Sequence, residues 1–291
     1  MKKNYIIVMV LVAIQLWQFI AVPLLPMAWA WTLLPLALLN NSMWSIMHEA
    51  IHGNLFKGRM NLWAGRVLSC LFGSSFQFLS AGHLSHHALN RSEAEQLEII
   101  PEGMPKWKAR LVYYFFMCGG LYVAEVLVPL AFIGPMKSLK KKLPEKTMIR
   151  MVFERATRKH LATALESIAA VTFLTCSALL YGANWPLFVG ILFARAFLIS
   201  SLEYIYHYGN VLGDVNAGYN LYLPRWVSAC LFHFNYHHVH HEAPKVPWYE
   251  LPKEAGRRNA KFDSGYFQAA LRAWKGPMTS EEAKIWREKH T

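Results

Sequence analysis

The chain has 291 residues, of which 54% are apolar and only 16% are charged, and its mean hydropathy is +0.19. Soluble domains average about 25% charged residues, so this composition argues against an ordinary soluble protein. The formal net charge of +12 is compatible with nucleic-acid binding. However, basic residues next to long apolar segments are better explained by contact with anionic lipid headgroups.

The first long apolar segment covers residues 6–22, carries no charge and is long enough to cross a bilayer as a helix. It exceeds the apolar core of a secretory signal peptide, which is about 7–15 residues long. We therefore expect an uncleaved first span. A second span at 29–47 follows an uncharged turn that contains Pro23 and Pro26, so the two spans form a hairpin.

Two further apolar segments, 164–182 and 185–204, predict a second hairpin that turns at Gly182. The segment 136–160, which precedes it, is strongly basic. Its Lys and Arg residues are Lys137, Lys140, Lys141, Lys142, Lys146, Arg150, Arg155, Arg158 and Lys159. The positive-inside rule places this segment and Lys2 and Lys3 in the cytoplasm, and the uncharged links on the other side.

The remaining apolar stretches are 62–80 and 111–133. A single crossing by either would put histidine clusters, or the basic segment, on opposite sides of the membrane. We therefore predict that both stretches are re-entrant or interfacial. The predicted fold is an all-α integral membrane protein with four transmembrane helices in two hairpins. A cytoplasmic cap carries the histidine motifs.

The end of the chain is expected to be soluble. Residues 266–274 have the pattern of a short amphipathic helix, and Thr279 with Glu282 forms a capping box for a last helix. We predict a membrane domain at 1–255 and a cytoplasmic helical tail at 256–291. The four cysteines (Cys70, Cys118, Cys176 and Cys230) stand singly, so they predict neither a CxxC motif nor a disulfide framework.

The chain contains thirteen histidines, and most of them are clustered. His48 and His52 are spaced i, i+4, which places both rings on one face of a helix. Two further motifs, HLSHH at 83–87 and HHVHH at 237–241, combine i, i+3 and i+4 spacings, and His207 follows the fourth predicted span. Adjacent imidazoles gain little by packing, whereas a metal ion explains why neutral rings converge. Isolated histidines such as His160 and His233 need no such explanation.

The number of candidate ligands indicates two metal ions. The nine proposed metal ligands are His48, His52, His83, His86, His87, His207, His237, His240 and His241. One tetrahedral ion takes about four ligands, so nine imidazoles suit two ions with four or five each. Imidazole binds Zn, Cu, Fe and Ni, so ligand type alone does not choose the metal. Within the third motif, His238 is an alternative to one of its neighbours.

The three motifs resemble the histidine boxes of the membrane fatty acid desaturase and hydroxylase superfamily. Residues 48–53 read HEAIHG, residues 83–87 read HLSHH and residues 235–241 read NYHHVHH. The stretch PWYELP at 247–252 is similar to one that follows the third box in that superfamily. The order and separation of the motifs match over most of residues 1–255.

This resemblance implies two iron ions, O2 as co-substrate and a ninth ligand near the end of the last span, where His207 fits. It also implies an external electron donor, such as ferredoxin or cytochrome b5 with its reductase. No catalytic residue separate from the metal centre is expected. Within the superfamily we favour desaturation of a fatty acyl chain. Alkyl hydroxylation, carotenoid ketolation or hydroxylation, and decarboxylation to a 1-alkene remain open, as does a metal transporter from another class.

Several polar residues are candidates for supporting roles. Glu49, Glu203, Asn90 and Asn235 are placed to accept hydrogen bonds from ligand N–H groups, with ordinary helix-end polarity as the alternative. Arg195 lies inside the fourth predicted span, where a charge is costly, so we expect it to pair with Glu125, Glu166 or a substrate carboxylate.

The expected partners are the lipid bilayer and a fatty acyl substrate, whether free or linked to CoA, a carrier protein or a lipid; nucleic acid is not expected. A bacterial inner membrane is the expected location.

Overall fold

The computed structural model describes residues 2–134, 143–145 and 147–290, and these residues are predominantly helical. The helical elements in chain order are α1 (Lys2–Leu16), the π-helix η1 (Trp17–Ala21), α2 (Val22–Leu24), η2 (Met27–Thr32), α3 (Leu33–Ala37), α4 (Asn40–His52), α5 (Arg59–Phe72), α6 (Phe76–Leu89), α7 (Lys106–Phe115), the π-helix η3 (Phe116–Gly120), α8 (Leu121–Leu127), η4 (Val128–Ile133), α10 (Met148–Thr157), α11 (His160–Tyr181), η5 (Gly182–Asn184), α12 (Trp185–His207), α13 (Arg225–Cys230), α14 (His237–Glu242), η6 (Trp248–Glu250), α15 (Leu251–Arg257), α16 (Tyr266–Ala273) and α17 (Ser280–His290). Strands β1 (Leu221–Tyr222) and β2 (Ser264–Gly265) form one short parallel pair.

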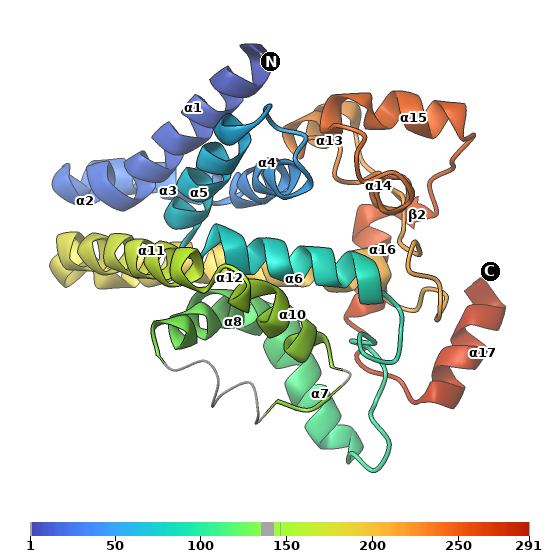
Figure 1. Ribbon diagram of the computed structural model, residues 1–291. Helices are drawn as coiled ribbons and strands as arrows, with labels where there is room; N and C mark the ends of the chain where they lie inside the picture. Colours follow the sequence, from blue (N-terminus) through green and yellow to red (C-terminus); the bar gives the residue numbers. More distant parts are fainter. Residues whose placement is uncertain (1, 135–142, 146, 291) are drawn as a thin grey trace.

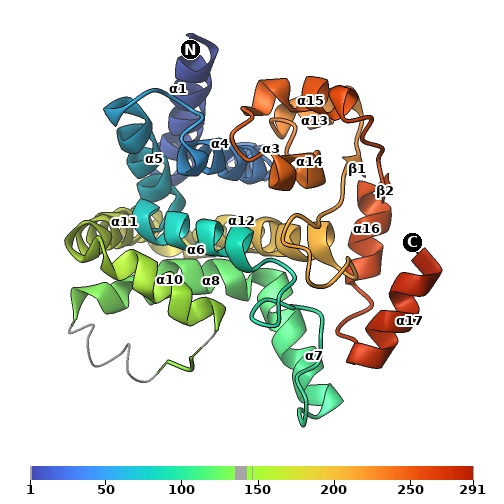
Figure 2. The same cartoon turned by 45° about the vertical axis from the view of Figure 1, so that its right-hand side comes forward.

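Three helical stretches within the described residues are long and apolar enough to cross a membrane: Lys2–Leu24, Lys106–Ile133 and His160–His207. The third stretch has 48 residues and contains α11, η5 and α12. In both views α11 and α12 lie side by side (Figures 1 and 2), so the chain reverses at η5, where Gly182 has a φ of +48°. These helices confirm the helical hairpin expected at 164–182 and 185–204; a double crossing by it stays a prediction.

The predicted second span, 29–47, is not one continuous helix. The apolar helix Met27–Ala37 ends at a turn before α4 begins at Asn40. Pro35, inside α3, lacks a backbone N–H, and the side chain of Asn40 donates to the carbonyl of Ala37 at 2.6 Å. The four predicted spans therefore correspond to two of the candidate stretches, Lys2–Leu24 and His160–His207, and to one interrupted stretch; His160–His207 contains both the third and the fourth predicted span.

The two stretches that were expected not to cross differ from one another. Residues 62–80 contain a corner, because α5 ends at Gly73, which has a φ of +103°, and α6 begins at Phe76. In contrast, Lys106–Ile133 is long and apolar enough to span. It is bent at η3, where Gly119 has a φ of +144°. A Cβ at Gly119 would lie 3.2 Å from the Cβ of Ala196, so glycine lets η3 approach α12 closely.

The central core lies where α4, α5, α6 and α12 meet. It includes Met43 and Met47 from α4, Phe72 from α5, and Ile199 and Leu202 from α12, all buried. The histidine-bearing ends of α4, α6 and α12 extend from this core toward α14 (Figures 1 and 2). The packed core thus brings together segments that are far apart in the sequence.

The C-terminal helices agree with the expected pattern. α16 packs against α12, and α17 begins with the predicted capping box. The backbone N–H of Thr279 donates to the Glu282 carboxylate at 2.8 Å, and that of Glu282 donates to the Thr279 hydroxyl at 3.2 Å. Five residues of the predicted basic segment lie outside the described residues: Lys137, Lys140, Lys141, Lys142 and Lys146.

Candidate metal centre

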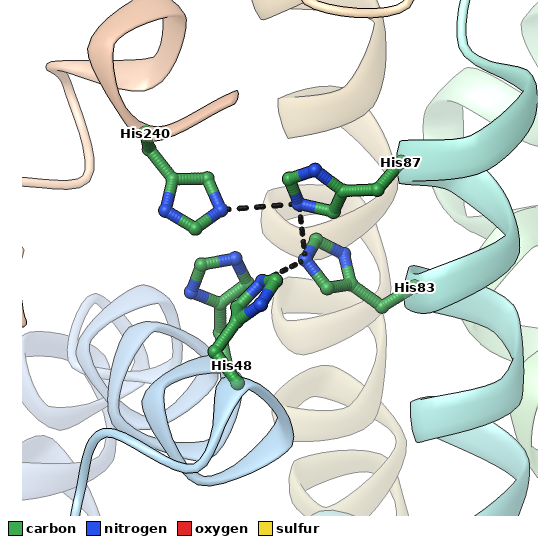
Figure 3. A group of neighbouring side chains, drawn as sticks. His48, His83, His87 and His240 are labelled. Carbon is green, nitrogen blue, oxygen red and sulfur yellow. Dashed lines mark hydrogen bonds between the residues drawn. The ribbon is translucent and has the colours of Figure 1, made fainter. Parts of the chain in front are cut away.

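The structure brings all nine predicted histidines together in two adjoining groups. One group consists of His48, His52, His83, His87 and His240; the other consists of His86, His207, His237 and His241. Within each group, one nitrogen from every ring lies within 4.8 Å of the others. Figure 3 shows rings of the first group facing one another from α4, α6 and α14.

Each HxxHH motif contributes to both groups. His83 and His87, one helical turn apart on α6, face the first group, whereas His86 faces the second. On α14 the assignment is reversed, because His237 and His241 face the second group and His240 faces the first. Each of these two helices therefore holds both candidate metal sites at a fixed separation.

The spacing of the ring nitrogens suits shared metal ions. In the first group the Nε2 atoms of His52 and His83 are 2.8 Å apart, and that of His87 lies 3.0 Å from His83 and 3.1 Å from His240. Two ligands about 2.1 Å from one ion would lie about 3.0 Å apart at a right angle and about 3.4 Å apart at the tetrahedral angle. In the second group, Nε2 separations of 3.0 and 3.1 Å join His237 to His207 and His241, and one of 3.3 Å joins His241 to His86.

The protonation states also favour metal binding. Burial lowers the pKa of His48, His83 and His240 well below the usual range, and it lowers the pKa of His52 to about 3 and that of His87 to about 2. Neutral rings present a lone pair at each converging nitrogen. The Nε2 atom of His48 is buried and has no hydrogen-bond partner among the described residues, and an ion shared by the group would provide one.

His86 has a different environment from the other rings. Its Nδ1 lies 2.9 Å from a carboxylate oxygen of Glu95 and 3.2 Å from one of Glu203. Burial opposes protonation, but the charges of Glu203 and Glu95 outweigh it and raise the pKa of His86 to about 9. An Nδ1–H held by carboxylates leaves Nε2 for a metal and makes it more basic. Glu95 was not predicted, because it lies in a loop whose path the sequence does not specify.

A buried ion pair fixes this loop. Two guanidinium nitrogens of Arg91 donate to the Glu98 carboxylate, at 2.9 and 2.5 Å, and each side chain is only 2% exposed. Arg91 also donates to the carbonyl of Asn210 at 2.8 Å, and the N–H of Gly209 donates to Glu98 at 3.1 Å. The pair therefore ties the loop that carries Glu95 to the segment that follows His207.

Two predicted supporting residues lie close to the rings. Glu203 contacts His86 and lies 3.8 Å from Nε2 of His207. Asn90 makes no hydrogen bond to the ring of His86 or His207 within the described part of the chain. It donates at 2.7 Å to the carbonyl of Ala217, and the same carbonyl accepts a hydrogen bond from Nδ1 of His207 at 3.1 Å. Asn90 therefore acts on His207 through a shared backbone oxygen.

The other two predicted supporting residues fix backbone instead of rings. Glu49 accepts the N–H of Trp248 at 3.0 Å and so ties the PWYELP segment to α4; burial raises the pKa of Glu49 to about 7. Asn235 donates to the carbonyl of Leu221 at 2.8 Å, just before α14. His238 lies outside both groups and donates from Nδ1 to the carbonyl of Asn216 at 3.1 Å.

The expected pairing of Arg195 with Glu125 or Glu166 is wrong, and a pairing with a substrate carboxylate stays a prediction. Its fully buried guanidinium donates to the side chains of Asn40 and Gln15 and to the carbonyls of Leu71 and Phe72. It also lies 4.7 Å from the ring centre of Phe19. Glu166 is paired instead with Arg66 at 2.8 Å. Neutral acceptors within the helix bundle satisfy Arg195, which is absent from the wall of the cavity described next.

A mainly apolar cavity of about 740 Å³ borders the histidines. His83, His86 and His237 form part of its wall, so the cavity touches both groups. The rest of the wall comes mainly from apolar residues of α6, α7, α8, α10 and α12. This volume lies within the range of small-molecule sites, and the lining suits a hydrocarbon chain.

Comparison with known proteins identifies the family. The fatty acid desaturase family model matches residues 8–269, which include all four histidine-bearing elements. Searches of the curated proteins and of the solved structures found no match. The match ends within α16, beyond the domain boundary predicted at residue 255. Because the family model covers most of the chain, as the histidine motifs suggested, this protein belongs to the fatty acid desaturase family.

Proposed function

We propose that this protein is a di-iron, O2-dependent desaturase of fatty acyl chains, with the nine clustered histidines as its metal ligands. Its family is one of oxidoreductases, and its apolar helices and histidine clusters mark it as a metal-binding membrane protein. The observation that carries the proposal is that one apolar cavity borders both histidine groups. An acyl chain in that cavity would place a methylene beside both metal sites.

The side chains have distinct tasks in this proposal. Unactivated C–H bonds require an oxidant stronger than any side chain, and bound iron with O2 supplies it. The nine imidazoles hold the ions, and Glu95 and Glu203 orient His86. Apolar wall residues such as Leu79, Ile199 and Leu202 exclude water from the acyl chain and fix its position.

The electrons come from a separate donor, such as ferredoxin or cytochrome b5 with its reductase. We place the protein in a bacterial inner membrane, with its histidine face toward the cytoplasm. The four-span topology and a cytoplasmic helical tail at 256–291 are also parts of the proposal. Alkyl hydroxylation, carotenoid oxidation and decarboxylation to an alkene remain alternatives. The family match gives no support to a metal transporter.

Product analysis tests this function. We expect cells that produce the protein and receive a labelled saturated fatty acid to form a labelled unsaturated product. His86→Ala and His240→Ala, one from each histidine group, should abolish the product while the protein still inserts into the membrane. Metal analysis should find about two irons per chain. An unchanged saturated pool, a hydroxylated product or a terminal alkene would each contradict the desaturase assignment, and stoichiometric zinc without O2 consumption would contradict the oxygenase.

A further inference from the structure

Glu125 is a carboxylate in the wall of the cavity that the metal centre does not use. It lies on α8, and its neighbours in the cavity wall are Leu121 and Ala124 of α8 and Val128 at the start of η4. Four glutamates line the cavity. Two of them, Glu95 and Glu203, contact His86, and Glu93 is exposed to solvent. Glu125 is the remaining one, and it lies within the apolar stretch Lys106–Ile133.

The position of Glu125 is fixed by the backbone around it. The Ser74 hydroxyl donates to the carbonyl of Glu125 itself at 2.5 Å. One turn earlier, Tyr122 donates from its hydroxyl to the carbonyl of Phe72 at 2.7 Å, and its N–H donates to the Ser200 hydroxyl at 3.1 Å. These bonds join α8 to the α5–α6 corner and to α12, so the carboxylate is held in a defined place in the wall.

One carboxylate oxygen of Glu125 lacks a partner within the part of the chain that the structure describes. The Oε2 atom of Glu125 is buried, and no hydrogen bond reaches it from the described residues. A buried carboxyl group without a partner is destabilising, especially inside an apolar stretch. Glu125 is only half-buried, and water in the cavity reaches the part of the residue that lines the wall, but an acyl chain that fills the cavity expels that water. A plain hydrocarbon would therefore leave the Glu125 carboxyl group unpaired. A substrate that carries a polar group beside Glu125 would form a hydrogen bond with it.

We propose that the natural substrate is an acyl chain that carries a hydroxyl or a secondary amide group, and that Glu125 recognises this group. The inference rests on the proposed oxidation of an acyl chain in this cavity and specifies the substrate class. Hydroxyl and secondary amide groups both donate and accept hydrogen bonds, so either one pairs with Glu125 whether the carboxyl is ionised or protonated. A site built around a buried polar group discriminates strongly against analogues that lack its partner.

The test compares matched acyl chains with the full-length protein in nanodiscs. One arm uses a saturated long-chain acid, its positional hydroxy derivatives and their methyl ethers. The second arm uses secondary amides and their N-methylated tertiary forms. We expect one hydroxyl position, or the secondary amide, to exceed both its blocked form and the plain chain in kcat/KM by about 10- to 100-fold. The arm that shows this preference identifies the polar group.

Variants of Glu125 connect the preference to this side chain. Glu125→Leu should abolish the preference, so that the kcat/KM values for the polar and the plain chain become about equal. This variant should use the plain chain at least as well as the wild type does. Glu125→Gln, which keeps a donor and an acceptor, should retain part of the preference. Glu102→Gln removes a solvent-exposed carboxylate outside the cavity wall and should retain all of it.

A binding measurement separates this inference from the proposed function. Displacement of a fluorescent fatty acid from metal-free protein should show the same preference and the same loss in Glu125→Leu, even if the reaction is not desaturation. The proposal is overturned if no hydroxyl position and no amide binds better than its blocked form. It is also overturned if Glu125→Leu lowers the binding of plain and polar chains equally.

Discussion

At the scale of single residues, the metal centre depends on side chains that control the rings as well as on the rings themselves. His86 and His207 belong to the same group but are oriented by different acceptors. Two carboxylates face Nδ1 of His86, whereas a backbone carbonyl accepts from Nδ1 of His207. A carboxylate makes the ring a stronger donor to a metal than a carbonyl does. The two rings therefore contribute unequally to one site.

Glu95→Gln tests this effect. The amide can still accept from His86, but it lacks the negative charge that raises the basicity of the ring. We expect iron affinity of the group that contains His86 to fall about 10- to 100-fold, while the group that contains His48 keeps its ion. Competition with a chelator, followed by metal analysis, measures both sites. Glu93→Gln, an exposed carboxylate on the same loop, is the control, and equal loss from both groups would contradict the assignment.

At the scale of elements, the loops around the centre are as firmly held as the helices. Arg91 has a φ of +62°, which is unusual for a residue with a side chain, and its O accepts the N–H of Gly213 at 2.9 Å. The Arg91–Glu98 pair then holds two loops, one before α7 and one after α12. Loops between helices usually tolerate change, but here they position Glu95 and support His207.

Arg91→Met is expected to destabilise the protein strongly. It leaves the Glu98 carboxylate buried without its cation, which costs about 3–5 kcal/mol of unfolding free energy. The double variant Arg91→Met/Glu98→Gln removes both charges and keeps an acceptor for the N–H of Gly209, so it should recover much of this loss. Denaturation in detergent compares the wild type, Arg91→Met, Glu98→Gln and the double variant. If the losses of the two single variants simply add in the double variant, the pair is not coupled as proposed.

At the scale of the whole molecule, four histidine-bearing elements converge, and the proposed topology puts them on one side of the membrane. The stretch Lys106–Ile133 is long enough to cross, but a single crossing would separate the segments on either side of it. It is bent at Gly119, packs on α12 and lines the cavity through α8. In the proposed topology the stretch follows a re-entrant path, and both of its ends remain on the cytoplasmic face.

Single cysteines in a cysteine-free background test this topology. Glu102→Cys and Glu145→Cys lie on either side of the stretch, and both positions are exposed. We expect a membrane-impermeant thiol reagent to label both only from the cytoplasmic side, and to label Ala183→Cys, in the turn between α11 and α12, only from the opposite side. Labelling of Glu102→Cys and Glu145→Cys from different sides would show that the stretch crosses.

Sequence patterns determined the features of this protein that depend on neighbouring residues. Helical spacing identified eight of the nine histidines, because residues three and four apart share a helix face wherever that helix lies. His207 was added from its place after the fourth predicted span and from the family resemblance. Two long apolar runs separated by a turn located the hairpin of α11 and α12, and the capping box at Thr279 located the start of α17. Arg195 shows the limit of such reasoning, because its partners come from segments distant in the sequence.

Only the tertiary structure decided which ring belongs to which group. His83 and His86 are three residues apart, yet they face different groups, because the rotation of α6 against α4 and α14 sets the direction of each ring. The same holds for Glu95 and Glu125, whose roles depend on the path of a loop and on the bend at Gly119. Local patterns identify the residues that can bind a metal, but the packing of helices distant in the sequence determines which residues meet and which cavity they face.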